Sequence, residues 1–261
     1  MTKEEELLAK RIKDLANKAD RAMRPVYSDF LNLNEQSIYE SLANELNFVD
    51  AYLWGGHNLS ERKMVVFLPK DYLIDEYTGI IGLFDAAFDC IRISPLNKKF
   101  ADKLNHRDYL GAILNTGIDR SKIGDIVVEE NMAYFFCVNS LSDFICNELT
   151  RVKHTSVMAT IDYDTDLSSI VAANYKLIQG SISSMRADSV VATAVKGSRS
   201  TAETIINEKK LFVNAKQVMK KDANINIGDV LSIRGYGKYI VDEVGSPNSK
   251  NRFKITLKMY Q

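Results

Sequence analysis

Residues 185–240 read MRADSVVATAVKGSRSTAETIINEKKLFVNAKQVMKKDANINIGDVLSIRGYGKYI. Apolar residues recur at helical spacing on both sides of Gly197, which predicts two short helices separated at that glycine. Ser198 or Ser200 is expected to cap the second helix, and Ser200 with Glu203 fits a capping box. The residues predicted to be buried by the two helices are Val190, Val191, Ala194, Ala202, Ile205 and Ile206.

Short strands are predicted after the helices, at 211–213 and 230–233, with tight turns at Asn214-Ala215 and Gly228-Asp229. Residues 183–261 hold 14 Lys and Arg against 7 Asp and Glu, a net charge of +7 in a chain whose total is zero. The predicted exposed cations are Arg186, Arg199, Lys209, Lys210, Lys216, Lys220 and Lys221. A small basic module of this kind is expected to meet the phosphates of folded RNA.

This stretch resembles the small RNA-binding domain named after ribosomal small-subunit protein four, here called the S-four domain. The matching positions are Arg186, Asp188, Ser198, Arg199, Ser200, Ala202, Ile206, Val213, Asn214, Lys216, Gly228, Asp229 and Val230. The sequence departs from the family at Lys209 and Ala215, where glycine is usual. The predicted RNA-binding residues are Arg186, Ser198, Arg199, Ser200, Lys209, Lys210, Asn214, Lys216, Lys220, Lys221, Arg234 and Lys238.

The preceding residues predict two further domains, and the chain as a whole predicts an α+β fold. The first, 1–76, should be an α-rich subdomain. Its predicted elements are helices at 3–23 and 35–46, the second capped by Asn34, and strands at 50–54 and 63–68 around a Gly55-Gly56 break. The second, 77–180, should have a ferredoxin-like βαββαβ arrangement. The third, 183–261, is the S-four domain with a C-terminal strand extension.

The order of hydrophobic patterns supports the ferredoxin-like expectation for the middle domain. The predicted elements are a strand within 79–93 that starts from an apolar stretch at 80–84, a helix at 106–115, strands at 125–129 and 133–138, a helix at 141–152 and a strand at 156–163. Ser140 or Asn139 is expected to cap the second helix. Helical turns at 167–178 should lead into the basic module.

Two segments resemble the signature of the YlmH family: LNHRDYLGAIL at 104–114 and GIDRSKIGDI at 117–126. GGHNLSERK at 55–63 is similar more loosely. The resemblance implies a bacterial factor that binds the RNA of the large ribosomal subunit, with tRNA or peptidyl-tRNA as a further partner. It also implies a role in quality control of stalled nascent chains. His106, Arg107 and Arg120 are candidates for a second RNA contact.

Several function classes find no support in the sequence. Cys90, Cys137 and Cys146 lack the spacing of a disulfide or zinc site, and the three histidines form no ligand cluster. The charged start and the absence of a run of about 18 apolar residues predict a cytoplasmic chain. His-Arg-Asp at 106–108 opens a kinase catalytic loop, but the other kinase motifs are missing. We expect no catalytic residues, cofactor, metal, small-molecule substrate or membrane partner.

Two alternatives to a ribosome-binding factor remain open at this point. S-four domains also accompany pseudouridine synthases, rRNA methyltransferases and tyrosyl-tRNA synthetases, but none of their catalytic motifs stands in 1–182. An adaptor for cell division is suggested by the genomic neighbourhood of the YlmH family. Turnover in an assay with cofactor and rRNA would support the first alternative, and a nuclease-resistant protein partner would support the second.

Overall fold

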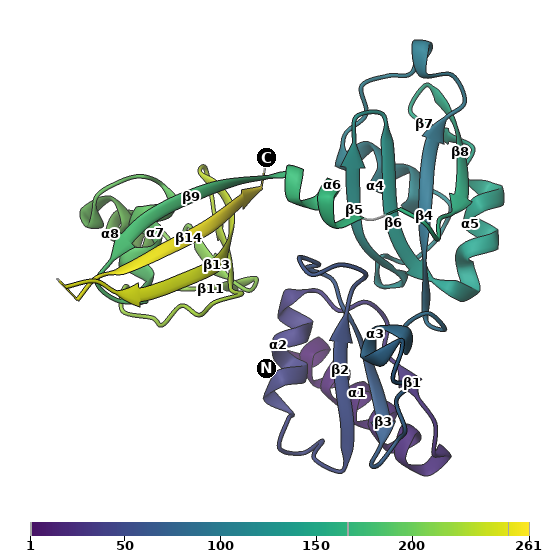
Figure 1. The fold of residues 1–261 in the computed structure, drawn as a ribbon, viewed down its shortest axis with the longest axis horizontal. Helices are drawn as coiled ribbons and strands as arrows, with labels where there is room; N and C mark the ends of the chain where they lie inside the picture. The colour runs from purple at the N-terminus through teal and green to yellow at the C-terminus, as the bar shows by residue number, and fades with distance from the viewer. Residues whose placement is uncertain (1, 166, 250, 261) are drawn as a thin grey trace. The chain divides into compact units, whose positions relative to one another are not determined.

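The computed structural model describes residues 2–165, 167–249 and 251–260, and contains both helices and sheets as the sequence predicts (Figure 1). The chain forms two compact units, Met1–Ile170 and Val171–Gln261. Two sheets belong to the first unit and one sheet to the second. The division into three domains at 1–76, 77–180 and 183–261 stays a prediction. In the described ranges, no helix combines the length and apolar character needed to cross a bilayer.

The first unit begins with a long helix that packs on a small sheet. Its elements are α1 (Lys3–Ala22), β1 (Val26–Tyr27), α2 (Leu33–Ser41), β2 (Val49–Trp54) and β3 (Met64–Pro69), with strand order β1-β3-β2. The sequence misplaced the start of α2, because Asn32 and not Asn34 is its cap. The Asn32 side chain accepts hydrogen bonds from the amides of Asn34 and Glu35, at 2.9 and 3.0 Å.

The apolar stretch at 80–84 is not the start of a strand. It contains the single-turn helix α3 (Gly79–Gly82), which follows a turn organised by Asp75. The Asp75 carboxylate accepts hydrogen bonds from the amides of Tyr77 and Thr78, at 3.0 and 2.9 Å. Within the stretch, Phe84 is buried and packs on Phe88. The apolar residues therefore serve to bury one aromatic side chain and do not form an alternating strand pattern.

The five-stranded sheet of the first unit has the strand order β5-β6-β4-β8-β7. Its elements are β4 (Phe88–Pro95), α4 (His106–Leu114), β5 (Ile123–Glu129), β6 (Met132–Val138), α5 (Ser142–Glu148), β7 (Arg151–Val152) and β8 (Thr155–Ile161). The four long strands are antiparallel and ordered as in a split βαβ arrangement. Helix α5 follows a short turn (Asn139–Leu141) and has no side-chain cap, because Asn139 donates instead to the Ala86 carbonyl.

The second unit is a six-stranded antiparallel sheet with two helices, ordered β11-β10-β12-β13-β14-β9. Its elements are β9 (Tyr175–Ile182), α7 (Ala187–Ala194), α8 (Arg199–Asn207), β10 (Leu211–Val213), β11 (Lys216–Gln217), β12 (Val230–Ile233), β13 (Gly237–Pro247) and β14 (Phe253–Tyr260). Helix α6 (Leu167–Ala173) precedes it. The helical prediction for 167–178 is wrong beyond Ala173, since β9 pairs with β14 along its whole length.

Candidate nucleic-acid interface

Helices α7 and α8 form the frame of the predicted RNA-binding surface. Lys196 has a φ of 51° and ends the first helix, and the Gly197 amide then donates to the Ala192 carbonyl at 2.9 Å. Ser198 caps α8 by accepting a hydrogen bond from the Thr201 amide at 3.1 Å. The predicted Ser200–Glu203 capping box is wrong, because Ser200 already lies inside the helix. All six predicted core residues of this pair are buried: Val190, Val191, Ala194, Ala202, Ile205 and Ile206.

Arg186 and Arg199 are brought together by a polar network at the starts of the two helices. The Arg186 Nε lies 3.3 Å from Oδ1 of the buried Asp188. Asp188 also accepts from the Ser189 amide at 2.9 Å, and the Ser189 hydroxyl accepts from Arg199 Nη2 at 3.1 Å. Arg199 donates a further hydrogen bond to the Ser183 hydroxyl. Both arginines remain exposed, so donors of each guanidinium are available to a phosphate.

The chain after β11 adds lysines beside these helix starts. The Lys221 carbonyl accepts a hydrogen bond from the Asp188 amide at 3.0 Å. The Lys221 ammonium lies 3.0 Å from a carboxylate oxygen of Glu203 on α8, and this exposed ion pair offsets the charge of that lysine. Lys220 is exposed next to it. We call this group the helix-pair surface, and its members are Arg186, Arg199, Lys220 and Lys221.

The other predicted cations gather at the opposite end of α8, which spans about 13 Å. The Arg234 amide donates to the Lys210 carbonyl at 3.0 Å, and the Arg234 guanidinium lies 4.7 Å from the centroid of the Phe212 ring. Glu208 lies 2.6 Å from the Lys210 ammonium and raises the pKa of that lysine. We call this second group the hairpin surface, and its members are Lys209, Lys210, Lys216 and Arg234.

Four of the predicted contact residues also have a structural role. The Asn214 amide group donates to Asp229 Oδ1 at 2.8 Å and its oxygen accepts from the Val230 amide at 3.0 Å, which fixes the turn. The Ser198 and Ser200 hydroxyls lie 2.7 Å apart at the start of α8. The Lys238 ammonium sits 5.2 Å from the centroid of the Tyr260 ring. Contact of these side chains with RNA stays a prediction.

The two departures from the S-four pattern prove to be backbone positions that favour glycine. Lys209 has a φ of 59° and Ala215 a φ of 64°, both in the left-handed region. In this region a residue with a Cβ destabilises the folded chain by roughly 1–2 kcal/mol relative to glycine. Replacing it by glycine removes that strain, but about half of the gain in stability is lost because glycine has more conformational freedom in the unfolded chain. The unusual residues at these positions therefore carry local strain.

We expect Ala215→Gly to stabilise the second unit by about 0.5–1 kcal/mol, because it relieves that strain. Hydrogen exchange of amides in β10, β12 and β13 under increasing urea measures the change. Lys216→Gly is the matched control, since Lys216 lies in β11, is exposed and has no positive φ. The control should lower the protection of the same amides from exchange. Equal effects of the two substitutions would contradict the explanation by backbone strain at Ala215.

The three residues predicted as a second RNA contact have different surroundings. His106 and Arg107 are exposed in the first turn of α4, which Asn105 caps. Arg120 instead directs its guanidinium inward and donates to the carbonyls of Ile123 and Gly124, at 2.6 and 3.0 Å. Burial, followed by the charge of Arg62, lowers the pKa of Arg120 to about 10. Its first role is structural.

Sequence patterns did not reveal the polar cluster around Arg62. The Arg62 guanidinium donates to the carbonyls of Phe30, Arg120 and Ile123, at 2.7, 3.2 and 2.9 Å. Asp125 accepts hydrogen bonds from the amides of Glu61 and Arg62. Burial, with the nearby Glu61 carboxylate, raises the pKa of Asp125 to about 6. These contacts attach the 55–63 segment to β5, so we assign the cluster a structural role.

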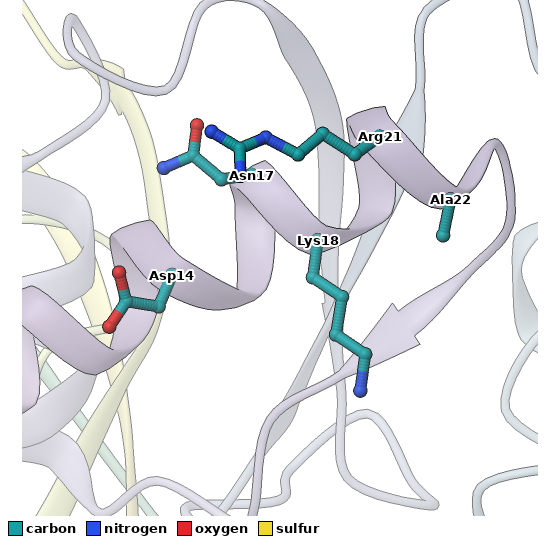
Figure 2. Close-up of a pocket in the computed structure, with 5 residues that line it drawn as sticks. All are labelled: Asp14, Asn17, Lys18, Arg21 and Ala22. Carbon is teal, nitrogen blue, oxygen red and sulfur yellow. The ribbon is translucent and has the colours of Figure 1, made fainter.

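A shallow pocket lies on α1, where the side chains that line it all come from that one helix (Figure 2). They are Asp14, Asn17, Lys18, Arg21 and Ala22. In the part of the chain that the structure describes, no group of His, Cys, Asp or Glu could hold a metal ion. The basic surfaces of the second unit therefore remain the best candidate site.

Comparison with known proteins matches the region of the five-stranded sheet to a class of RNA-binding domains. Residues 88–165 match the family described as "Putative RNA-binding domain in YlmH". A curated relative is the ribosome-associated protein quality control protein P2 of Bacillus subtilis strain 168. It is 28% identical over 233 residues, which cover 88% of this chain and 85% of the relative.

A solved structure with the same fold is the cell division protein YlmH from Streptococcus pneumoniae. The two chains are 20% identical with a TM-score of 0.50, and the match covers 62% of this chain and 93% of the other. The two sequence matches bear out the resemblance to the YlmH family that the motifs predict, and the solved structure shows the shared fold.

Proposed function

We propose that this chain is an RNA-binding factor that docks on the RNA of the large ribosomal subunit and performs no chemistry of its own. The observation that carries the proposal is the network that joins Arg186 and Arg199 through Asp188 and Ser189 and leaves both guanidinium groups exposed. The planar guanidinium of an exposed arginine can donate two parallel hydrogen bonds to a phosphate. The helix-pair and hairpin surfaces would together follow the backbone of a folded RNA.

The relative in Bacillus subtilis is named as a ribosome-associated quality control protein, which supports the same site of action for this chain. We infer a role on large subunits that carry stalled nascent chains, where tRNA or peptidyl-tRNA is a further partner. The matched RNA-binding domain at 88–165 would supply contacts in addition to those of the second unit.

A modifying enzyme that uses a cysteine nucleophile is disfavoured by the surroundings of two thiols. Burial raises the pKa of Cys90 and of Cys137 to about 12. Both sulfurs therefore stay protonated at neutral pH, whereas the thiolate is the reactive form. An assay for turnover on rRNA tests the other reaction types.

The test of the proposal is the double variant Arg199→Glu with Lys216→Glu, which reverses one charge on each surface. We expect its affinity for purified large subunits to fall at least tenfold in cosedimentation. The slope of log affinity against log salt should shrink by about 2, one for each lost phosphate contact.

The control is Lys10→Glu with Lys18→Glu, which makes the same change of net charge on exposed positions of α1. This variant should bind large subunits within about twofold of the parent protein, since electrostatic contacts are local at physiological salt. Equal losses in both double variants would reduce the effect to net charge. Unchanged binding of the first would remove the second unit from the mechanism.

A further inference from the structure

One end of the five-stranded sheet collects a dense group of cations from three separate segments. The cations are Lys98, Lys99, Lys103, Arg107, Arg151 and Lys153, together with the imidazoles of His106 and His154. All of these side chains are exposed. The segments are the β4–α4 connection, the first turn of α4 and the β7–β8 hairpin, which lie together beyond the end of β4 (Figure 1).

Specific hydrogen bonds hold these segments together. The Leu96 amide donates to the Ser156 carbonyl at 3.0 Å. The Asp102 amide donates to the Thr155 hydroxyl at 2.8 Å, and the Asp102 carboxylate accepts from the same hydroxyl at 3.2 Å and from the His154 amide at 3.3 Å. The β4–α4 connection is therefore fixed against the hairpin, and its lysines project from an ordered framework.

The acidic side chains within the three segments already have partners. Asp102 is occupied by the hydrogen bonds described above, and Asp108 lies 2.8 Å from the Lys153 ammonium. Among the described residues, Lys98, Lys99, Lys103 and Arg107 take part in no ion pair. The Asn105 cap already occupies amides of the first turn of α4, so the positive potential comes from side chains.

An exposed aromatic ring lies beside one of these cations. Phe100 is 77% exposed at the end of a short helical turn, Lys98–Phe100, whose cap is Asn97. The Lys99 ammonium lies 5.9 Å from the centroid of the ring. An exposed phenylalanine gains nothing from folding, whereas an aromatic face among cations is the usual arrangement for stacking an unpaired base.

The sheet surface itself is a poorer platform for bases. On β6, Tyr134 and Phe136 are only 4% and 5% exposed. The Phe136 ring packs against Phe88 and lies near His57, with centroid separations of 5.6 and 6.1 Å, so the 55–63 segment covers that face. Stacking on the sheet aromatics, as RNA-recognition sheets do, is therefore blocked at this strand.

We propose that this β4–α4 surface, defined by Lys98, Lys99, Phe100, Lys103, Arg107 and Arg151, is a second RNA site that takes an unpaired segment. The lysines and arginines contact its phosphates, and one base stacks on Phe100. The proposal rests on the RNA-binding function proposed above, but it uses a different surface, and each can fail without the other.

The test uses the full chain that already carries Arg199→Glu and Lys216→Glu, so that the second unit contributes little. The probes are a fluorescein-labelled oligouridine of 12 nucleotides and a blunt RNA duplex of the same length, followed by fluorescence anisotropy. Adding Lys98→Glu, Lys99→Glu and Lys103→Glu should weaken oligouridine binding at least tenfold and reduce the salt slope by about 2.

Phe100→Ala should weaken oligouridine binding by about tenfold and leave the salt slope unchanged, because it removes stacking and no charge. Phe100→Trp should restore the affinity. The matched control for the lysine variant is Lys10→Glu, Lys18→Glu and Arg21→Glu on α1, which should change binding less than twofold. Thermal unfolding of these variants should match that of the Arg199→Glu and Lys216→Glu background, since every side chain substituted in addition is exposed.

The outcomes separate the two proposals. Oligouridine binding that survives both the lysine variant and Phe100→Ala would overturn the β4–α4 site alone. Duplex binding as tight as oligouridine binding, with no effect of Phe100→Ala, would exclude recognition of an unpaired segment. If the β4–α4 variants lose oligouridine while Arg199→Glu with Lys216→Glu leaves ribosome binding intact, the second site stands and the docking surface of the proposed function fails.

Discussion

Arg62→Ala should destabilise the first unit by about 3–5 kcal/mol, the cost typical of removing one partner from a buried ionic network. The guanidinium satisfies carbonyls of Phe30, Arg120 and Ile123, which come from distant parts of the sequence. Alanine removes this donor from the Phe30 and Arg120 carbonyls, while the Ile123 carbonyl keeps its hydrogen bond from Arg120. It also deprives Asp125 of a neighbouring positive charge. Lysine has a single ammonium and cannot reach all three carbonyls, so Arg62→Lys should retain only part of the stability.

The measurement is urea unfolding followed by the fluorescence of Trp54. The chain has one tryptophan, and it lies in β2, so its signal reports on the first unit and not on the second. Arg21→Ala is the control, because Arg21 lies on the exposed face of α1 (Figure 2) and should cost less than 0.5 kcal/mol. A loss of unfolding free energy below 1 kcal/mol for Arg62→Ala would show that the cluster does not hold the 55–63 segment on β5.

Local sequence signals predicted the α7–α8 pair correctly because its determinants are close in sequence. Gly197 separates the helices, the apolar spacing identifies their inner faces, and the Asn214-Ala215 turn follows from residue type. The choice between Ser198 and Ser200 as the cap needed the structure, since either serine stands in a suitable local context. The donor that decides it is the amide of Thr201.

Elements that depend on distant partners were not predictable in the same way. Strand β9 reads as a helical continuation until β14, about 75 residues later, is placed beside it. Arg120 looks like any surface arginine in the sequence, and only the folded chain shows its guanidinium turned toward the carbonyls of Ile123 and Gly124. The sequence predicted Arg107 as a second RNA contact but not the rest of the β4–α4 surface, because Arg151 lies far from Lys98 in sequence.

The contribution of His57 to the unfolding free energy of the first unit should fall by about 3 kcal/mol between neutral pH and pH 4. It is 6% exposed, and neither ring nitrogen has a hydrogen-bond partner within the described residues. Burial, followed by the charge of Lys63, lowers the pKa of His57 from 6.5 to about 4. The unfolded chain therefore binds a proton near pH 6.5 while the folded chain does not, and stability falls as the pH drops toward 4.

Asp125 opposes this effect in nearly the same pH range. Its pKa rises from 3.8 to about 6 on folding, so the folded chain binds that proton first and gains about 2 kcal/mol as the pH falls from 6 to 4. The parent protein should then show little net change in its unfolding free energy. Only variants can reveal the two opposed contributions.

His57→Leu removes one contribution and keeps the site apolar, and it sacrifices no hydrogen bond. Urea unfolding followed by Trp54 fluorescence at pH 7, 6, 5 and 4 should show this variant gaining stability on acidification, by about 3 kcal/mol relative to the parent. Asp125→Asn should show the reverse, with stability lost over the same interval. Parallel pH profiles for the parent and His57→Leu would mean that His57 takes up a proton in the folded chain as readily as in the unfolded one.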